Sequence, residues 1–170
     1  MSGAGQFIDV NAYAAANVTT EMSSYVWHVG KETVQRQTGR HAMPFMTQAA
    51  QYPCADGRYV TTGFPPRDQK GMANLYAWIE ELGGEAACPE AIFIKQGAEA
   101  EEPPNLQLLG EDETVTNLMS ACRDGLVFCA SKVSAFEFFT RTQEAGLQTG
   151  VIFSPEEALE NEHFVARGFP

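Results

Sequence analysis

The sequence has no long apolar run. Its longest apolar stretches, such as residues 12–16, are far shorter than the roughly 20 residues that a membrane-spanning helix needs. The first residues also lack the basic start and the apolar core of a secretory signal. We therefore expect a cytoplasmic protein with no membrane partner.

Positive charge is also scarce. The chain has 11 Lys and Arg against 22 Asp and Glu, which gives a formal net charge of -11. Such a surface repels phosphate backbones, so we expect no nucleic-acid partner. Much of the acidic excess lies in residues 99–102 and 156–162, which we interpret as a solvated loop and a solvated helix face.

Patterns for metal binding and for catalysis are missing as well. The four cysteines form no CxxC pair, and the three histidines show neither HxxxH nor HExxH spacing. We predict no metal site, and buried thiols in preference to disulfides. The chain contains no GxSxG elbow, no phosphate-binding loop and no Cys–His signature, so the residues alone predict no catalytic group.

What the chain does have is a hydrophobic content of 44%, which is enough for a packed core. Near the N-terminus, residues 6–10 predict a strand. The residues after it predict one amphipathic helix, with Asn11 as its N-cap and Gly30 as its end. Polar residues 31–42 are then expected to form a loop.

The rest of the chain predicts a hairpin followed by helices. Asp56-Gly57 stands between two β-compatible runs, and both residues tolerate positive φ. Pro53 indicates that the first strand ends there or lies at a sheet edge, and Pro65-Pro66 prevents the second strand from continuing. After the hairpin we expect a helix over 68–82, with Trp78 off its apolar stripe, and then a strand or a buried turn over 91–94. A further helix should start at Asp112, with Gly125 as a kink or a split. The remaining elements are a helix from Ser134 to near Gly146, a strand over 150–153 and a helix from Ser154. The fold class is α+β: a small antiparallel sheet with a β-hairpin, packed against four or five helices.

The most site-like stretch is the loop after the second predicted strand, residues 61–71. Loops at strand ends often carry function, and Arg67 and Lys70 are cations in an acidic chain that suit an anionic ligand. An ordinary connection with surface charges is the alternative. Arg167 could bind a carboxylate or a phosphate, or it could form hydrogen bonds that hold a helix end. His163 is expected at the surface or half-buried. Asp9 either caps the next helix or acts as an acid without a nearby partner.

Four motifs, in this order, resemble the family III CoA-transferases, which include formyl-CoA and carnitine CoA-transferases and α-methylacyl-CoA racemase. They are GAGQFIDVN at 3–11, DGRYV at 56–60, the strand entry at 143–152 and the helix at 159–168. Within the last motif, Asn161, His163, Arg167 and Gly168 stand where the family pattern has them. The resemblance spans nearly the whole chain and is weakest over residues 85–110.

The resemblance implies a domain organisation and a role. Residues 1–30 resemble the end of the family's large-domain segment, and residues 31–170 resemble its small α+β domain, which closes over the active site. The family's nucleophilic aspartate lies upstream of the GxGQ motif, in a Rossmann-like CoA-binding domain, so no position here corresponds to it. The chain alone is then expected to be inactive, with no cofactor of its own and coenzyme A as a substrate of the complete enzyme.

The resemblance also implies partners and a substrate-facing loop. The partner is a second copy, joined through residues 6–10 or the following helix, or a separate chain that carries the CoA-binding domain. The racemase branch has a glutamate before the loop proline, where this chain has Pro65, and the formyl branch has glycines where this chain has prolines. Only a location carries over, the loop of Gly63, Phe64, Pro65, Pro66 and Arg67. The function expected is thus a truncated or split CoA-transferase-like protein; the alternatives are a non-catalytic binding or assembly module with that fold, and an unrelated α+β enzyme.

Overall fold

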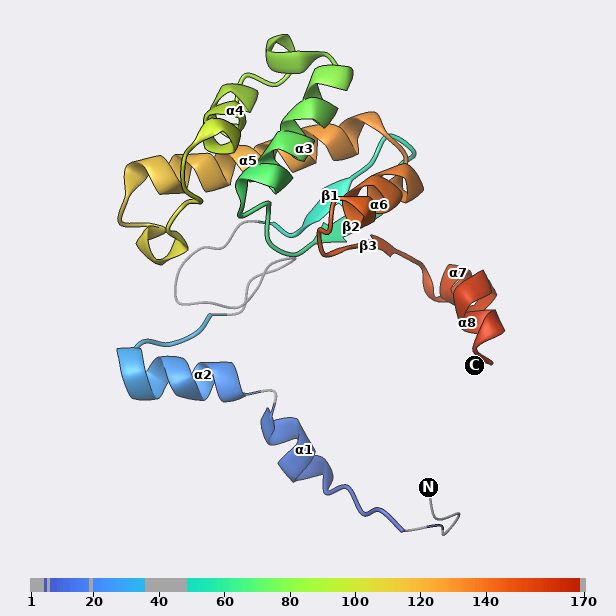
Figure 1. The fold of residues 1–170 in the computed structure, drawn as a ribbon. Coiled ribbons are helices and arrows are strands. Elements are labelled where there is room, and N and C mark those ends of the chain that lie inside the picture. Colours follow the sequence, from blue (N-terminus) through green and yellow to red (C-terminus); the bar gives the residue numbers. More distant parts are fainter. Residues whose placement is uncertain (1–4, 6, 19, 36–48, 169–170) are drawn as a thin grey trace. The chain divides into compact units, whose positions relative to one another are not determined.

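A computed structural model describes residues 5, 7–18, 20–35 and 49–168 (Figure 1). The chain divides into two units, Met1–Ala49 and Ala50–Pro170. The second unit contains all the strands that the structure describes, and most of the helices.

The first unit consists of short helical segments whose described side chains are all at least partly exposed. They are α1 (Ala12–Val18), α2 (Glu21–Tyr25) and the π-helical turn η1 (Val26–Gly30). Asn11 is the predicted N-cap, and its Oδ1 accepts a hydrogen bond from Ala14 N at 3.1 Å. The end at Gly30 is also confirmed, because Lys31 turns into the left-handed region at φ 58°.

Two predictions for this unit are wrong. Residues 7–10 form no strand, because the described part of the unit offers no neighbouring strand to pair with their backbone groups. The single long helix is interrupted between α1 and α2. There the Thr20 hydroxyl donates to Asn17 O at 2.8 Å, a local bond of the kind that competes with the helical ladder.

The second unit begins with the predicted hairpin. Strands β1 (Gln51–Pro53), β2 (Tyr59–Thr62) and β3 (Thr149–Ile152) form an antiparallel sheet in the order β1-β2-β3, with Tyr52 opposite Val60 and Val60 opposite Val151. Gly57 adopts φ 78° in the connection, which explains the Asp-Gly signal. Pro53 ends an edge strand, as expected. The fold is α+β, as predicted.

The tip of the hairpin is fastened to the helices by long-range hydrogen bonds. Ala55 N donates to Val133 O at 2.9 Å, and Ala135 N donates to Asp56 Oδ2 at 3.1 Å. Asp56 Oδ1 also accepts from Arg58 N at 3.2 Å within the turn. The same aspartate therefore shapes the turn and binds the first residue of a helix far along the chain.

Four helices of this unit begin where the sequence predicts a helix start. Side-chain oxygens of Asp68, Asp112, Ser134 and Ser154 each accept from a backbone N–H of the first turn, and Ser154 forms a complete capping box with Glu157. The helices are α3 (Gln69–Glu81), α4 (Ala91–Glu99), α5 (Glu113–Lys132), α6 (Ala135–Glu144), α7 (Pro155–Glu160) and α8 (Glu162–Ala166), with 3₁₀ turns η2 (Gly84–Ala86) and η3 (Leu106–Leu108). The strand or turn expected over 91–94 is instead the start of α4.

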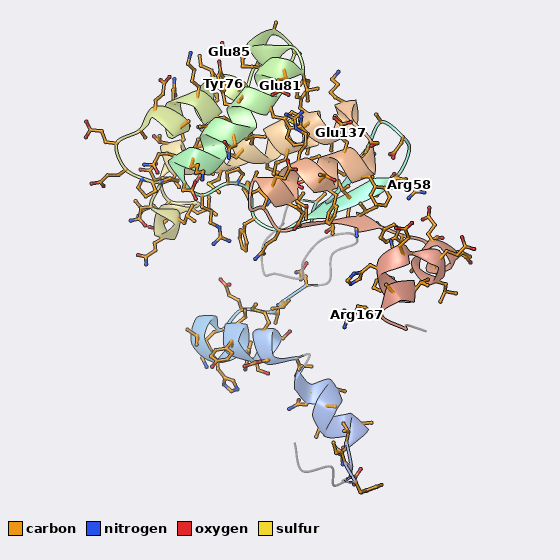
Figure 2. The ribbon with its side chains drawn as sticks, turned by 45° about the vertical axis from the view of Figure 1, so that its right-hand side comes forward. Arg58, Tyr76, Glu81, Glu85, Glu137 and Arg167 are labelled. Carbon is orange, nitrogen blue, oxygen red and sulfur yellow. The ribbon has the colours of Figure 1, made fainter. Side chains whose placement is uncertain are left out.

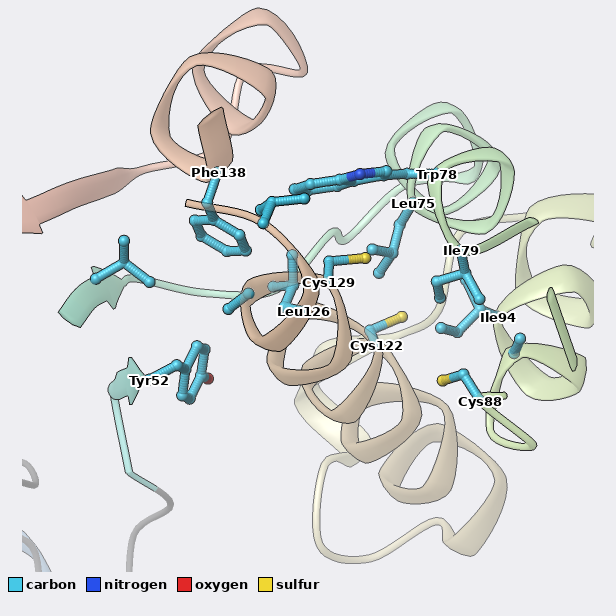
Figure 3. Close-up of a cluster of buried hydrophobic side chains, with 14 of the residues drawn as sticks. Tyr52, Leu75, Trp78, Ile79, Cys88, Ile94, Cys122, Leu126, Cys129 and Phe138 are labelled. Carbon is cyan, nitrogen blue, oxygen red and sulfur yellow. The ribbon is translucent and has the colours of Figure 1, made fainter. Parts of the chain in front are cut away.

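The core is built around α5, as Figure 3 shows. Helices α3 and α4 pack on it from one side, and β1 and α6 contribute Tyr52 and Phe138. Trp78, expected off the apolar stripe of α3, is only 6% exposed, and its ring lies 5.5 Å from the Phe138 ring with a tilt of 40°, so it belongs to the core. α3 contacts more than one neighbour, which widens its buried face beyond a single stripe.

Gly125 does not split α5, which runs unbroken from Glu113 to Lys132. A Cβ at this position would lie 2.8 Å from Ile94 Cδ1 and 3.0 Å from Ile79 Cδ1. The glycine thus lets α3 and α4 approach α5 closely, and it costs helix propensity.

Candidate functional site

The predicted loop, residues 63–67, is tied to a neighbouring segment at its first residue and contains two buried prolines. Gly63 N donates to Gln148 O at 2.8 Å, which ties the end of β2 to the turn before β3. Pro65 and Pro66 are buried. Arg67 Cζ stacks 3.9 Å from the centre of the exposed Phe64 ring, so the loop orients its own cation.

This loop forms one wall of a groove. The first turn of α3 continues that wall, and the turn between α6 and β3 forms the wall opposite, through Glu144, Ala145, Gly146, Leu147 and Gln148. The hollow between them measures about 500 Å³. Four of the five residues of the predicted loop, Phe64 to Arg67, therefore border a concave surface, and Lys70 borders it with them, whereas Gly63 does not line it.

A second hollow of about 300 Å³ continues the groove between α3 and α6. The two share Gly71, Asn74, Glu144, Ala145 and Leu147. The second hollow reaches Trp78, whose ring lies 4.8 Å from Arg141 Cζ. Arg141 Nη2 forms an ion pair with Glu81 Oε2 at 2.6 Å, so the positive charge of Arg141 is already compensated. Figure 2 shows where Glu81 lies.

Some charged side chains along the groove already have a bonding partner, and others have no ion pair within the described part of the chain. Asp68 Oδ1 accepts from Gly71 N at 2.7 Å as the helix cap. Within residues 49–168, neither Arg67 nor Lys70 has an ion pair. The groove thus has one end with two uncompensated cations, while Glu144 borders both hollows. This arrangement suits an anion at the end formed by the loop.

The other charged candidates lie elsewhere. Arg167 is exposed at the end of α8 (Figure 2), and its backbone N–H, not its side chain, donates to Phe164 O at 3.2 Å. His163 is exposed on the same helix. Asp9 is exposed in the first unit, where Asn11 and not Asp9 caps the helix. None of these residues borders the groove.

The cysteines are free and buried, as expected. Burial raises the pKa of the Cys122 and Cys129 thiols to about 12 and raises the pKa of Cys54 and Cys88 above the ordinary value. These thiols are therefore protonated at neutral pH and unsuited to act as nucleophiles. Over the described residues there is no cluster of three metal-ligating side chains, and no helix is both long and apolar enough to cross a bilayer.

Sequence reasoning found one wall of the groove and missed the other. The loop carried a signal, because prolines and cations follow a strand. The opposite wall carried only the turn glycine Gly146, at φ 77°, and nothing in the sequence states that Gln148 meets Gly63. Arg141 and Glu81 were missed because their pairing depends on how α3 and α6 pack. No protein-family model, no curated protein and no solved structure matches this chain.

Proposed function

We propose that this chain acts as the small domain of a family III CoA-transferase-like protein and covers the site where coenzyme A moves between carboxylic acids. One observation carries the proposal. The loop that the motif resemblance assigns to the substrate-facing edge borders a groove of about 500 Å³ with Arg67, and Lys70 of the adjoining helix α3 borders the same groove. A second support is that the DGRYV motif forms the hairpin from which this loop leaves.

In this role the chain binds and encloses the substrate and does not supply the nucleophile. Of the carboxylates along the groove, Asp68 caps α3, Glu81 pairs with Arg141, and Glu144 borders both hollows. The aspartate that forms the covalent intermediates belongs to the CoA-binding domain, which a partner provides. The buried prolines Pro65 and Pro66 restrict the backbone of the loop, which suits a surface that covers a site.

The partner surface lies in the first unit under this proposal. Large apolar side chains there are highly exposed, among them Phe7 at 94%, Tyr13 at 88% and Val29 at 81%. Short helices without buried side chains gain little stability alone, so a second copy or the CoA-binding chain would cover them. A Val29→Asp variant should then lower the apparent mass in light scattering, whereas a strictly monomeric wild-type chain at high concentration contradicts self-association.

Reconstitution tests the proposed function directly. The full chain is mixed with a family III CoA-transferase from which the small domain has been removed, and transfer of CoA between two carboxylic acids is measured. We expect transfer in the mixture, none with either component alone, and a loss with Arg67→Gln. Lys95→Gln is the matched control, since Lys95 lies over Tyr76 on the helices and away from the groove.

The alternative is a non-catalytic assembly module, and the exposed apolar residues of the first unit favour it. It predicts a stable complex with the truncated enzyme, or with a second copy, but no transfer. Tight binding of coenzyme A to the isolated chain, at sub-micromolar concentration, would contradict both readings, because each places the CoA site in another domain.

A further inference from the structure

We propose that the groove binds a monocarboxylic acid with an apolar body, with the carboxylate at Arg67 and Lys70 and the body directed toward Trp78. The inference rests on the proposed function, because it takes the loop of residues 63–67 as the substrate-facing one. It adds which end of the groove holds the charge and which chemical class of acid fits.

The cationic end is prepared for an anion. Stacking on Phe64 fixes the Arg67 guanidinium while leaving its N–H groups without a carboxylate among residues 49–168. Lys70 borders the same hollow from the first turn of α3. A planar guanidinium beside an ammonium group can bind both oxygens of a carboxylate, and bonds of this kind are the stronger ones in proteins.

The other end carries the larger apolar side chains of the groove. Leu75, Trp78, Leu126 and Leu147 line the second hollow, together with the polar side chains of Asn74, Glu81, Arg141, Thr142 and Glu144. Arg141 covers one face of the Trp78 ring, and its charge is neutralised by Glu81.

Glu144 supplies a selectivity element. It borders both hollows, so it lies along the path from the cationic end to the apolar end. Its carboxylate repels a second negative charge on the ligand, whereas Asp68 and Glu81 are already engaged. The groove should therefore prefer a monocarboxylate over a dicarboxylate of similar length.

The test uses the full chain with Trp27→Phe, so that Trp78 is the only tryptophan. Titration with octanoate should change the Trp78 fluorescence and saturate. Octan-1-ol lacks the charge, acetate lacks the body and octanedioate adds a second carboxylate, and each should bind about tenfold more weakly or worse. Arg67→Gln and Lys70→Gln should each weaken octanoate binding by about tenfold, and Glu144→Gln should tighten it.

Lys95→Gln serves as the matched loss of a cation and should leave octanoate binding unchanged, because Lys95 does not border the groove. Equal binding of octanoate to wild type and to the Arg67→Gln, Lys70→Gln double variant would overturn the inference. CoA transfer in the reconstituted mixture without saturable octanoate binding also overturns it, while the proposed function survives. Charge-dependent octanoate binding without transfer of any acid supports the inference and rejects the proposed function.

Discussion

Replacing Asp56 with alanine should destabilise the second unit more than any other loss of a single helix-capping acid. The carboxylate accepts two backbone hydrogen bonds, one from Arg58 N inside the turn and one from Ala135 N at the start of α6. The Ala135 residue is fully buried, so its N–H would lose its acceptor in a place where water cannot readily replace it.

The magnitude follows from these two bonds. A bond to a charged acceptor contributes about 1.5–3 kcal/mol, and Asp56 itself is exposed, which places the Ala135 bond at the low end of that range. The exposed turn bond adds about 0.5 kcal/mol. We therefore expect Asp56→Ala to lower the free energy of unfolding by about 2 kcal/mol, and Asp56→Asn, which keeps an acceptor oxygen, by about 1 kcal/mol.

Urea denaturation in the Trp27→Phe background provides the assay, since Trp78 reports on the core of the second unit. With a slope of about 1–3 kcal/mol per molar urea, the midpoint should move by about 1 M. Asp112→Ala is the matched control, because Asp112 caps α5 through one local bond at 3.0 Å and should cost about 1 kcal/mol. If Asp56→Ala costs no more than Asp112→Ala, the hairpin tip does not hold α6 in the way argued.

Three further predictions concern packing, thiol chemistry and the C-terminal helices. Gly125→Ala should lower stability by about 1 kcal/mol in the same urea assay, because crowding in the core outweighs a gain in helix propensity of about 1 kcal/mol; a more stable variant would refute the close approach. A thiol reagent at pH 8 should label Cys122 and Cys129 only after unfolding, since both are buried and their pKa of about 12 keeps them protonated, and rapid labelling of the folded chain would contradict this. Arg58 and Glu157 form a half-exposed ion pair at 2.5 Å, so a double-mutant cycle should give a coupling below about 1 kcal/mol that fades in 1 M salt, and a larger or salt-independent coupling would speak against it.

The parts of the fold that sequence predicts well are those set by local chemistry. Asp-Gly requires a backbone conformation that few other pairs tolerate, and the Ser154 capping box is complete within four residues. Both are confirmed with little dependence on the rest of the chain. The short apolar run over 91–94 carries no period of its own, and only packing against α3 and α5 makes it part of a helix.

The candidate site divides in the same way. The loop of residues 63–67 was identifiable because a strand end, prolines and cations stand together in sequence. Its function as a wall depends on the Gly63–Gln148 hydrogen bond and on Trp78 meeting Phe138, which join segments far apart in the chain. The burial of Trp78 was not predicted because α3 packs against both α4 and α5 while Trp78 also meets Phe138 of α6, and a single-stripe pattern describes only one such face.

The first unit shows the opposite relation between sequence and structure. Its apolar residues recur at intervals that predict a strand and then an amphipathic helix, yet Phe7, Tyr13 and Val29 are almost fully exposed. Burying one such side chain contributes about 1.5–3 kcal/mol, so several together would supply the tertiary packing on which short helices depend. A periodic apolar pattern indicates a face that is buried by packing, and the surface that packs on it can belong to another chain. The proposed association would cover these exposed side chains, and the light-scattering comparison of wild type with Val29→Asp tests it.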